Sequence, residues 1–478
     1  MGRRRFSLII AFVLYCALSW AQAPARLDCG QILAWMAGGV PSRQIFRLAR
    51  EQGTALGPAE EKVLVSLDPG LEELRTLPSF SEKSVACPAR LTKTVELVRQ
   101  KRYPQAEAIL RNELATQGDS AALHFALANV LQQQDDWDAA FDEFSAANRI
   151  RPGFAEIHIR LAYLFYRSDD GDSAIAEART GLSLDPGNAD AYRYLGLGFY
   201  AQGRYAAALH AFQEALVAEP GSAETYYDAG ITQRARGALP NAVAAYRGAL
   251  SLKPDFWEAH TNLAVVLHDL GRLDEAVAEY REAKRLAPDE PAVRNNLGNT
   301  YCDKGDYDAA IAEFRELYRR HPGWQDGHGC MAKAFMAKKD YDSAIAEFRA
   351  VLLQNPKSAG ERRALGQALL LANRTQEAVV ELRQAAALDP DSAAGHHLLG
   401  TALFQTESFK DALEEFRAAL RLEPTAENHY YLAACLMRLQ RDDEALAELE
   451  IASQLEPGQV RYRARKEELI KLMQADAR

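Results

Sequence analysis

The sequence has an excess of acidic over basic residues and, beyond its N-terminal segment, no long hydrophobic run. It carries 56 Lys and Arg against 66 Asp and Glu, a formal net charge of −10 at pH 7. A general nucleic-acid binder needs a dense field of Lys and Arg to displace counterions from phosphates, so we expect no nucleic-acid partner. Its 30 Gly and 19 Pro are too few for a collagen-like or linker-dominated chain.

The motifs of common catalytic and cofactor sites are also missing. The chain contains no GxxxxGK[ST], HExxH, CxxC, GxSxG or EF-hand loop. We therefore predict that the protein is not an enzyme and has no catalytic residue, cofactor or metal site of its own.

The first 23 residues are typical of a secretory signal peptide. Arg3, Arg4 and Arg5 precede a largely apolar run from Phe6 to Trp20, and Ala21 and Ala23 supply candidate cleavage sites. The run is short for a bilayer core of about 30 Å. We expect an exported protein, periplasmic or secreted, with no transmembrane segment in the mature chain; an uncleaved N-terminal membrane anchor is the alternative.

A 34-residue repeat accounts for most of what remains. Ten of the 19 prolines form one ladder, with nine of them spaced by 34 residues and the last by 33: Pro152, Pro186, Pro220, Pro254, Pro288, Pro322, Pro356, Pro390, Pro424 and Pro457. Periodicity of this length indicates a repeat array. The chain divides into ten units that start at 121, 155, 189, 223, 257, 291, 325, 359, 393 and 426.

Each unit has the pattern of two antiparallel helices. Positions 8 and 20 are Ala or Gly in all ten units, which lets two helices approach closely. Position 7 is commonly Leu and position 24 commonly Phe or Tyr, whereas Gly stands at position 15 in four units. Glycine suits the positive φ at a helix C-terminus, and the proline ends the second helix.

These columns resemble the tetratricopeptide repeat (TPR) over 121–459. The resemblance implies an all-α fold, a right-handed TPR superhelix whose concave face, lined by first helices, binds peptides or proteins. The array is similar to that of O-GlcNAc transferases, but without a transferase domain. A degenerate TPR is predicted over 87–120, and residues 460–478 are predicted to form a C-terminal capping helix, since solenoids need polar caps.

Residues 24–86 lack the repeat. Apolar clusters around Leu33, Leu48 and Leu64, separated by Gly-Pro breaks, predict a small helical N-terminal module. Cys29 and Cys87 bracket this module and are a candidate disulfide, because export permits disulfides. Cys302, Cys330 and Cys435 fall within predicted helices and are expected to be buried thiols.

Six of the ten histidines stand at position 4 of a unit, a regularity that favours a structural role over a metal cluster. Unit 7 is expected to be a flexible point, since Gly327 and Gly329 fall in its predicted first helix, each at a cost of ~1 kcal/mol relative to Ala.

The TPR resemblance places the peptide-binding face on first-helix positions 2, 5, 9, 12 and 13, with position 6 close by. Aromatic and Arg side chains, which dominate binding hot spots, gather there in units 1–4, and Asn side chains in units 5–6. The candidate groove residues are Phe125, Arg160, Tyr163, Tyr166, Arg167, Arg193, Tyr200, Tyr227, Arg234, Asn262, Asn295, Asn296 and Asn299.

Two functions are compatible with this pattern. The first is a non-catalytic scaffold or adaptor that binds peptides or proteins in its concave groove, for example in envelope protein assembly. The second is a targeting or substrate-recruiting subunit of an enzyme complex such as a glycosyltransferase system. The sequence leaves the partner and the oligomeric state open.

Overall fold

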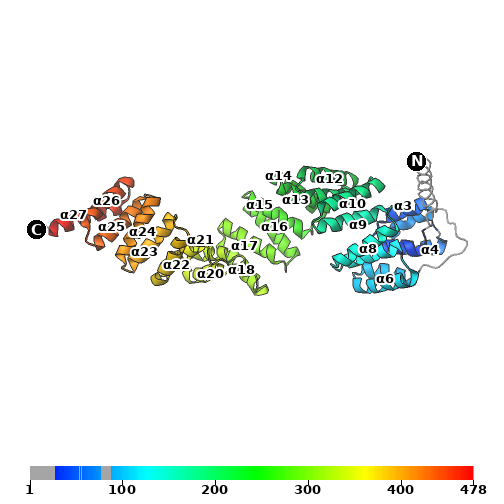
Figure 1. The fold of residues 1–478 in the computed structure, drawn as a ribbon, viewed down its shortest axis with the longest axis horizontal. Coiled ribbons are helices and arrows are strands. Elements are labelled where there is room, and N and C mark those ends of the chain that lie inside the picture. The colour runs from blue at the N-terminus through cyan, green and yellow to red at the C-terminus, as the bar shows by residue number, and fades with distance from the viewer. Residues whose placement is uncertain (1–26, 53, 55, 77–87, 477–478) are drawn as a thin grey trace, which may run out of the picture. The chain divides into compact units, whose positions relative to one another are not determined.

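The computed structural model describes residues 27–52, 54, 56–76 and 88–476. The described residues form helices without a single β-strand (Figure 1). The predicted all-α solenoid of helix pairs is confirmed. The predicted signal peptide at residues 1–23 lies outside the described residues. None of the helices in the described ranges is long and apolar enough to cross a membrane.

Four short helices form the N-terminal part: α2 (Cys29–Ala37), α3 (Ser42–Gln52), α4 (Pro58–Leu67) and the 3-10 helix η1 (Pro69–Thr76). A capping box starts α2, with the Asp28 carboxylate accepting from the Gln31 backbone N–H and the Gln31 side chain accepting from the Asp28 N–H. Pro58 starts α4, in the first helical turn where its missing N–H is harmless.

Helices α5 (Ala89–Arg99) and α6 (Tyr103–Gln117) follow, within the segment predicted as a degenerate repeat. The ten units then contribute ten helix pairs. Their first helices are α7 (Ala121–Gln132), α9 (Ala155–Arg167), α11 (Ala189–Ala201), α13 (Ala223–Ala235), α15 (Trp257–Asp269), α17 (Pro291–Lys304), α19 (His328–Ala337), α21 (Ala359–Leu371), α23 (Ala393–Gln405) and α25 (Ala426–Arg438). Their second helices are α8 (Trp137–Ile150), α10 (Gly171–Leu184), α12 (Tyr205–Ala218), α14 (Leu239–Leu252), α16 (Leu273–Leu286), α18 (Tyr307–Arg320), α20 (Tyr341–Gln354), α22 (Thr375–Leu388), α24 (Phe409–Leu422) and α26 (Asp442–Leu455). Helix α27 (Val460–Asp476) packs on α26.

The helices divide into two compact parts, residues 1–253 and 254–478, each described by itself. In both parts each first helix packs mainly on the second helix of its own unit and next on the helices of adjacent units. The core is therefore distributed along the array, as expected for a solenoid.

Position 8 of a unit lies directly against position 24. A Cβ added to Gly196 would come within 2.5 Å of the Phe212 ring, and one added to Gly230 within 2.6 Å of the Tyr246 ring. The expectation that small residues let the paired helices approach closely is confirmed at these positions.

The turn between the two helices of a unit has position 15 in the left-handed region in every unit. Gly203, Gly237, Gly271 and Gly305 have φ between 70° and 82°. The other six units hold a non-glycine residue there with φ between 57° and 62°: Asp135, Asp169, Lys339, Asn373, Glu407 and Gln440. The same turn is thus made with and without glycine.

Unit 7 departs from the common pattern. Its first helix, α19, begins at His328 instead of position 1, and Gly327 precedes it with φ 98°. Gly327 is therefore outside the helix in which it was expected, while Gly329 lies inside. A Cβ on Gly327 would collide with the Phe314 ring of the preceding unit, so this close approach requires glycine.

The prediction of buried thiols is wrong for two of the three cysteines in the repeats. Cys302 and Cys330 form a disulfide with their Cα atoms 6.3 Å apart. They lie in the first helices of adjacent units, which brings residues 28 apart in sequence side by side. Cys435 is a buried free cysteine, as expected.

Candidate functional site

The surface of interest is the first-helix face, which we define as the side chains at positions 2, 5, 6, 9, 12 and 13 of the first helices. In the first compact part, which ends at Lys253, this face is not open from end to end. Helix α2 packs against α5 and α7, the first helices of the degenerate repeat and of unit 1. The N-terminal helices thus cover the start of the face.

Phe125, a candidate groove residue, is fully buried beneath this contact. Its ring lies 5.2 Å from that of Trp35 of α2, between centroids, and 5.3 Å from that of Phe144. Trp35 is itself buried and also packs on Phe154, at 4.3 Å. Phe125 is therefore part of the core that joins α2 to unit 1 and is not available to a partner. The assignment to an open groove overlooked a covering segment that has no repeat pattern.

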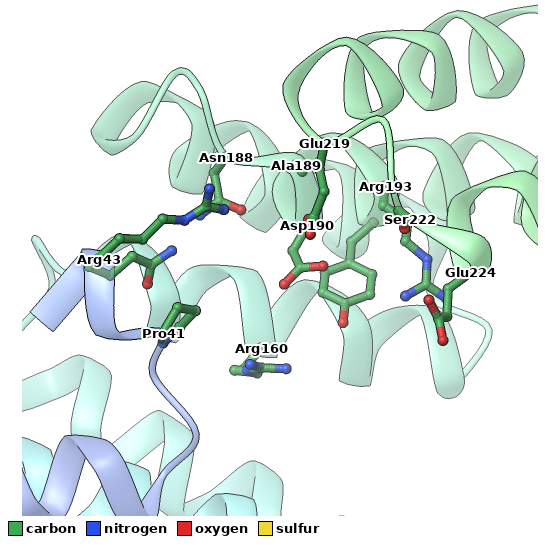
Figure 2. A pocket seen from close by; sticks show the side chains of 13 residues that line it. Pro41, Arg43, Arg160, Asn188, Ala189, Asp190, Arg193, Glu219, Ser222 and Glu224 are labelled. Atoms are coloured by element: carbon green, nitrogen blue, oxygen red, sulfur yellow. The ribbon is translucent and has the colours of Figure 1, made fainter. Parts of the chain in front are cut away.

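Next to this covered region lies a cavity of about 570 Å³. Pro41 and Arg43 of the N-terminal part stand on one side, and Arg193, Ser222 and Glu224 of the repeats on the other (Figure 2). The complete lining is Pro41, Arg43, Gln44, Arg160, Asn188, Ala189, Asp190, Arg193, Tyr194, Glu219, Gly221, Ser222 and Glu224. The cavity is bounded by units 2–4 and by the segment that leads into α3.

Arg160 reaches this cavity from α9. Its Nη2 lies 3.0 Å from Oε1 of Glu156, one helical turn earlier, and Glu156 is buried. Burial raises the pKa of the Glu156 carboxyl, and the nearby Arg160 opposes that rise. The Nε of Arg160 is buried without a hydrogen-bond partner among the described residues. Arg160 is thus held in place with one donor unused.

Arg193 reaches the same cavity from α11. Its Nε donates to Oδ2 of Asp228 at 2.5 Å, across to the first helix of the next unit. Asp228 is buried, and burial raises its carboxyl pKa against the opposing effect of Arg193. Tyr194 lies beside them, and burial raises its pKa to about 12. Hence Tyr194 remains a neutral hydroxyl at physiological pH.

Four of the predicted tyrosines are half-buried on or near this face. The Tyr163 ring lies 5.3 Å from that of Tyr194, and the Tyr200 ring 5.8 Å from that of Tyr205. The Tyr227 ring lies 5.9 Å from that of Tyr246. Burial raises the pKa of Tyr166, and Asp228 adds to the shift. These rings pack on neighbouring helices and leave part of their surface exposed.

Two predicted arginines lie outside the cavity lining. Arg167 stacks on Trp137 of unit 1, its guanidinium carbon 4.2 Å from the ring centroid. Arg234 is exposed near the end of α13. The structure therefore brings Arg160 and Arg193 together at one cavity and sets Arg167 and Arg234 apart from its lining.

The asparagines belong to the second compact part. Asn262, Asn295, Asn296 and Asn299 are all half-buried. The side-chain oxygen of Asn295 is buried without a hydrogen-bond partner among the described residues. An unpaired buried acceptor costs about 1–3 kcal/mol, which sets Asn295 apart from the other three asparagines.

Cys29 is disulfide-bonded. Cys87, its candidate partner, lies outside the described residues, so the Cys29–Cys87 pairing stays a prediction. Among the described residues, no group of three or more His, Cys, Asp or Glu is arranged to hold a metal ion.

Sequence reasoning missed Asp190, Glu224 and the buried partners Glu156 and Asp228. Glu156 and Arg160 are an i, i+4 pair and could have been found on the helix. Arg193 and Asp228 are 35 residues apart, so only the stacking of adjacent units reveals them. Arg43, at the start of α3, was missed because the N-terminal helices have no repeat pattern.

Stacked helix pairs with one repeated turn and one repeated small-residue contact define a helical-repeat protein. The family comparison agrees: tetratricopeptide repeat models match residues 95–153, 159–223, 227–291 and 397–459, and residues 301–369 and 335–402. The chain belongs to the tetratricopeptide repeat family. None of the curated proteins compared with it matches.

Several solved structures are similar to parts of the chain. MamA from Desulfovibrio magneticus RS-1 is 22% identical, with 35% of this chain and 94% of MamA covered and a TM-score of 0.34. PilF from Pseudomonas aeruginosa is 20% identical over 43% of this chain and 93% of PilF, with a TM-score of 0.38. A tetratricopeptide repeat protein from Parabacteroides merdae is 16% identical over 52% of this chain and 98% of that protein, also with a TM-score of 0.38.

Proposed function

We propose that the protein is a non-catalytic TPR scaffold that binds a peptide or protein partner on its first-helix face. In the first compact part, the contact region is the cavity lined by Arg160 and Arg193. TPR proteins are generally scaffolds, and family membership supports this role. The observation that carries the proposal is that both arginines are fixed at one cavity by buried carboxylates.

Fixing the arginines lowers the entropy lost when a partner binds. A free arginine loses rotamer entropy when it is immobilised, at roughly 0.5–1.5 kcal/mol per side chain. Glu156 and Asp228 hold the guanidinium groups before any partner arrives. The half-exposed tyrosines beside them add rigid apolar area, and Tyr and Arg are enriched among binding hot spots.

The carboxylates around the cavity also determine which groups the two arginines can bind. Each is paired with a buried carboxylate, and Asp190, Glu219 and Glu224 add further negative charge to the lining. The arginines therefore do not form an open basic patch. They offer remaining N–H donors at fixed positions, which suits backbone carbonyls of a partner as well as its carboxylates.

The test is binding of the full-length chain to an immobilised peptide library, followed by titration of the best peptide. Replacing Arg193 alone would leave Asp228 buried and unpaired, so the variant is Arg193→Met with Asp228→Leu, which removes both charges. We expect its affinity for that peptide to fall by about tenfold or more, the loss of one hot spot. Arg149→Ala, an exposed arginine on the second helix α8 and off the first-helix face, is the matched control.

Retention of full affinity in the double variant, or an equal loss in Arg149→Ala, would overturn this assignment. Envelope protein assembly is the setting we propose for the scaffold. A partner that proves to be a glycosyltransferase or another enzyme would instead place the protein as a recruiting subunit.

A further inference from the structure

The Cys302–Cys330 disulfide joins two units across the first-helix face. Cys302 stands at position 12 of unit 6, in α17, and Cys330 at position 6 of unit 7, in α19. Both positions belong to the face on which we propose that partners bind. The bond is a cross-link between adjacent helix pairs and leaves each pair's own two-helix core untouched.

The cross-link spans the junction where the regular packing is interrupted. Helix α19 lacks the first turn that the other first helices of the repeats have, and Gly327 takes up a left-handed conformation in its place. Trp324, just before this turn, has an indole Nε1 that is buried without a hydrogen-bond partner among the described residues. A junction with a missing helical turn and an unpaired donor depends more than its neighbours on a covalent link.

Some non-covalent contacts across this junction do not involve the disulfide. The Tyr318 ring stacks on His328 with centroids 4.7 Å apart, and its hydroxyl donates to the Asp326 carbonyl at 3.0 Å. Lys338 forms an ion pair with Asp308 of the preceding unit. With these contacts in place, opening the disulfide would loosen the junction and leave the two units folded.

The two cysteines of the disulfide are less buried than the third cysteine of the repeats. Cys302 and Cys330 are both only partly buried, whereas Cys435 is fully buried. Burial raises the pKa of the Cys435 thiol to about 12, which makes it unreactive. The repeats thus contain one partly buried disulfide and one buried free cysteine, Cys435, that serves as an internal reference.

We propose that Cys302–Cys330 is a reversible thiol–disulfide exchange site, with a dithiol reductant as its co-substrate. A thiolate of the reductant attacks one sulfur, the S–S bond breaks, and the other cysteine leaves as a thiolate that takes up a proton. The reductant's second thiol then attacks the mixed disulfide. The products are two cysteine thiols and the oxidised, disulfide form of the reductant, so that two electrons pass to the protein.

The consequence for binding rests on the proposed function of the first-helix face. Asn299, a candidate peptide contact, lies one turn before Cys302 on α17, and Asn295 one turn earlier still. Release of the cross-link would free α19 to shift against α17 and would alter the surface offered next to these asparagines. Redox state would therefore adjust partner binding in units 5–7 and leave the cavity of units 2–4 unchanged.

The experiment uses the full-length chain, purified without reductant and then treated under native conditions with dithiothreitol or a thioredoxin-type protein. Alkylation of thiols with mass mapping reports which cysteines are free. We expect Cys302 and Cys330 to be blocked before treatment and labelled after it, with Cys435 unlabelled throughout. Hydrogen exchange of α19 should rise by roughly 30-fold on reduction, at the lower end of what a disulfide contributes to stability.

The variant Cys302→Ala/Cys330→Ala should show the raised exchange of α19 without reductant and no further change with it. Cys435→Ala is the control and should behave as the unmodified protein. Labelling of Cys302 and Cys330 before reduction, resistance of the bond to both reductants, or unchanged exchange after its reduction would each overturn the proposal. Failure of peptides to bind would count against the proposed function and leave these three measurements unaffected.

Discussion

The side chain at position 4 of the first helix contacts both the second helix of its unit and the proline turn before the unit. In six units it is a histidine whose Nδ1 lies 2.5–2.6 Å from a glutamate Oε2 at position 23 of the same unit. In His158, His260 and His396 the Nε2 also contacts the carbonyl of the preceding ladder proline. Arg294 and Arg362 make the same two contacts in units 6 and 8. The histidine column is structural, as its regular spacing indicated.

These contacts predict a pH-dependent stability. Burial lowers the pKa of His158, His260 and His396, but hydrogen bonds to the glutamate and to the proline carbonyl outweigh it, so the net pKa is raised above 6.5. Because the folded pKa exceeds the unfolded one, this stabilisation is complete below about pH 6.5 and is lost as pH rises through the folded pKa. We expect a lower thermal midpoint at pH 8.5 than at pH 6, by roughly 2–4 °C per kcal/mol lost.

Thermal melts of the triple variant His158→Gln/His260→Gln/His396→Gln provide the check. The fall in midpoint between pH 6 and pH 8.5 should shrink in this variant. It should persist in the control His210→Gln, since His210 is exposed. An identical fall in the triple variant and in the unmodified protein would assign the pH dependence to other groups.

At the scale of the helix pair, the turn at position 15 gives a second prediction. A non-glycine residue in the left-handed region costs about 1–2 kcal/mol, and Lys339 and Glu407 both have this conformation. We expect Lys339→Gly and Glu407→Gly to raise the thermal midpoint. The free energy of unfolding should rise by about 0.5–1 kcal/mol, because the higher entropy of glycine in the unfolded chain offsets part of the relieved strain.

Asn373→Gly is the matched comparison, because asparagine adopts the left-handed region more readily than other side chains. Its gain should be smaller than those of the other two substitutions. Gly203→Ala tests the reverse change and should lower the midpoint. Equal effects at Lys339 and Asn373 would mean that backbone strain is not what limits stability at this turn.

Much of the helix pair could be predicted from the sequence, because its determinants lie within one unit. Small residues at position 8 and the left-handed turn at position 15 are local and recur in all ten units, and position 24 carries an aromatic ring in seven of them. The predictions that were wrong concern residues whose contacts lie between units or with the N-terminal helices, which have no repeat. Cys302 and Cys330 were predicted to be buried thiols because each falls within a predicted helix, and the sequence does not show that adjacent units bring them together. Phe125 was placed on an open face because nothing in the sequence shows that Trp35 covers it.

The candidate site was predictable to the same extent. The family pattern placed Arg160 and Arg193 on the first-helix face, and both line the cavity. It did not predict that Asp228 of the next unit holds Arg193, because that pairing depends on how units stack. Nor did it predict that the N-terminal helices form one wall of the cavity.

At the scale of the whole molecule, each helix pair contacts mainly the adjacent pairs. We therefore expect a destabilising substitution to affect only the units near it. Trp35→Ala removes a fully packed ring between Phe125 and Phe154 and should cost about 3–5 kcal/mol at that contact. We expect faster hydrogen exchange in α2 and α3. Exchange in residues 254–478 should be unchanged, because solenoid stability is a sum of nearest-neighbour terms.

The measurement is hydrogen exchange of Trp35→Ala compared with that of Trp257→Ala, a variant in the second compact part. Trp257 is half-buried at the start of α15, so its effect should remain within 254–478. Loss of protection throughout the chain in either variant would show that the two parts unfold as one cooperative unit.

The contact from the ladder proline to position 4 bears on how such an array can change in length. A block that runs from one proline to the residue before the next contains the carbonyl, the histidine or arginine and the glutamate, all the partners of one such cluster. Unequal recombination that adds or removes 34 codons would leave every cluster complete, wherever the breakpoint falls. An insertion of another length between the proline and the glutamate would separate the partners of one cluster, whereas the stretch from the glutamate to the next proline lies outside it. Relatives should therefore differ in length by whole blocks or by changes in that stretch.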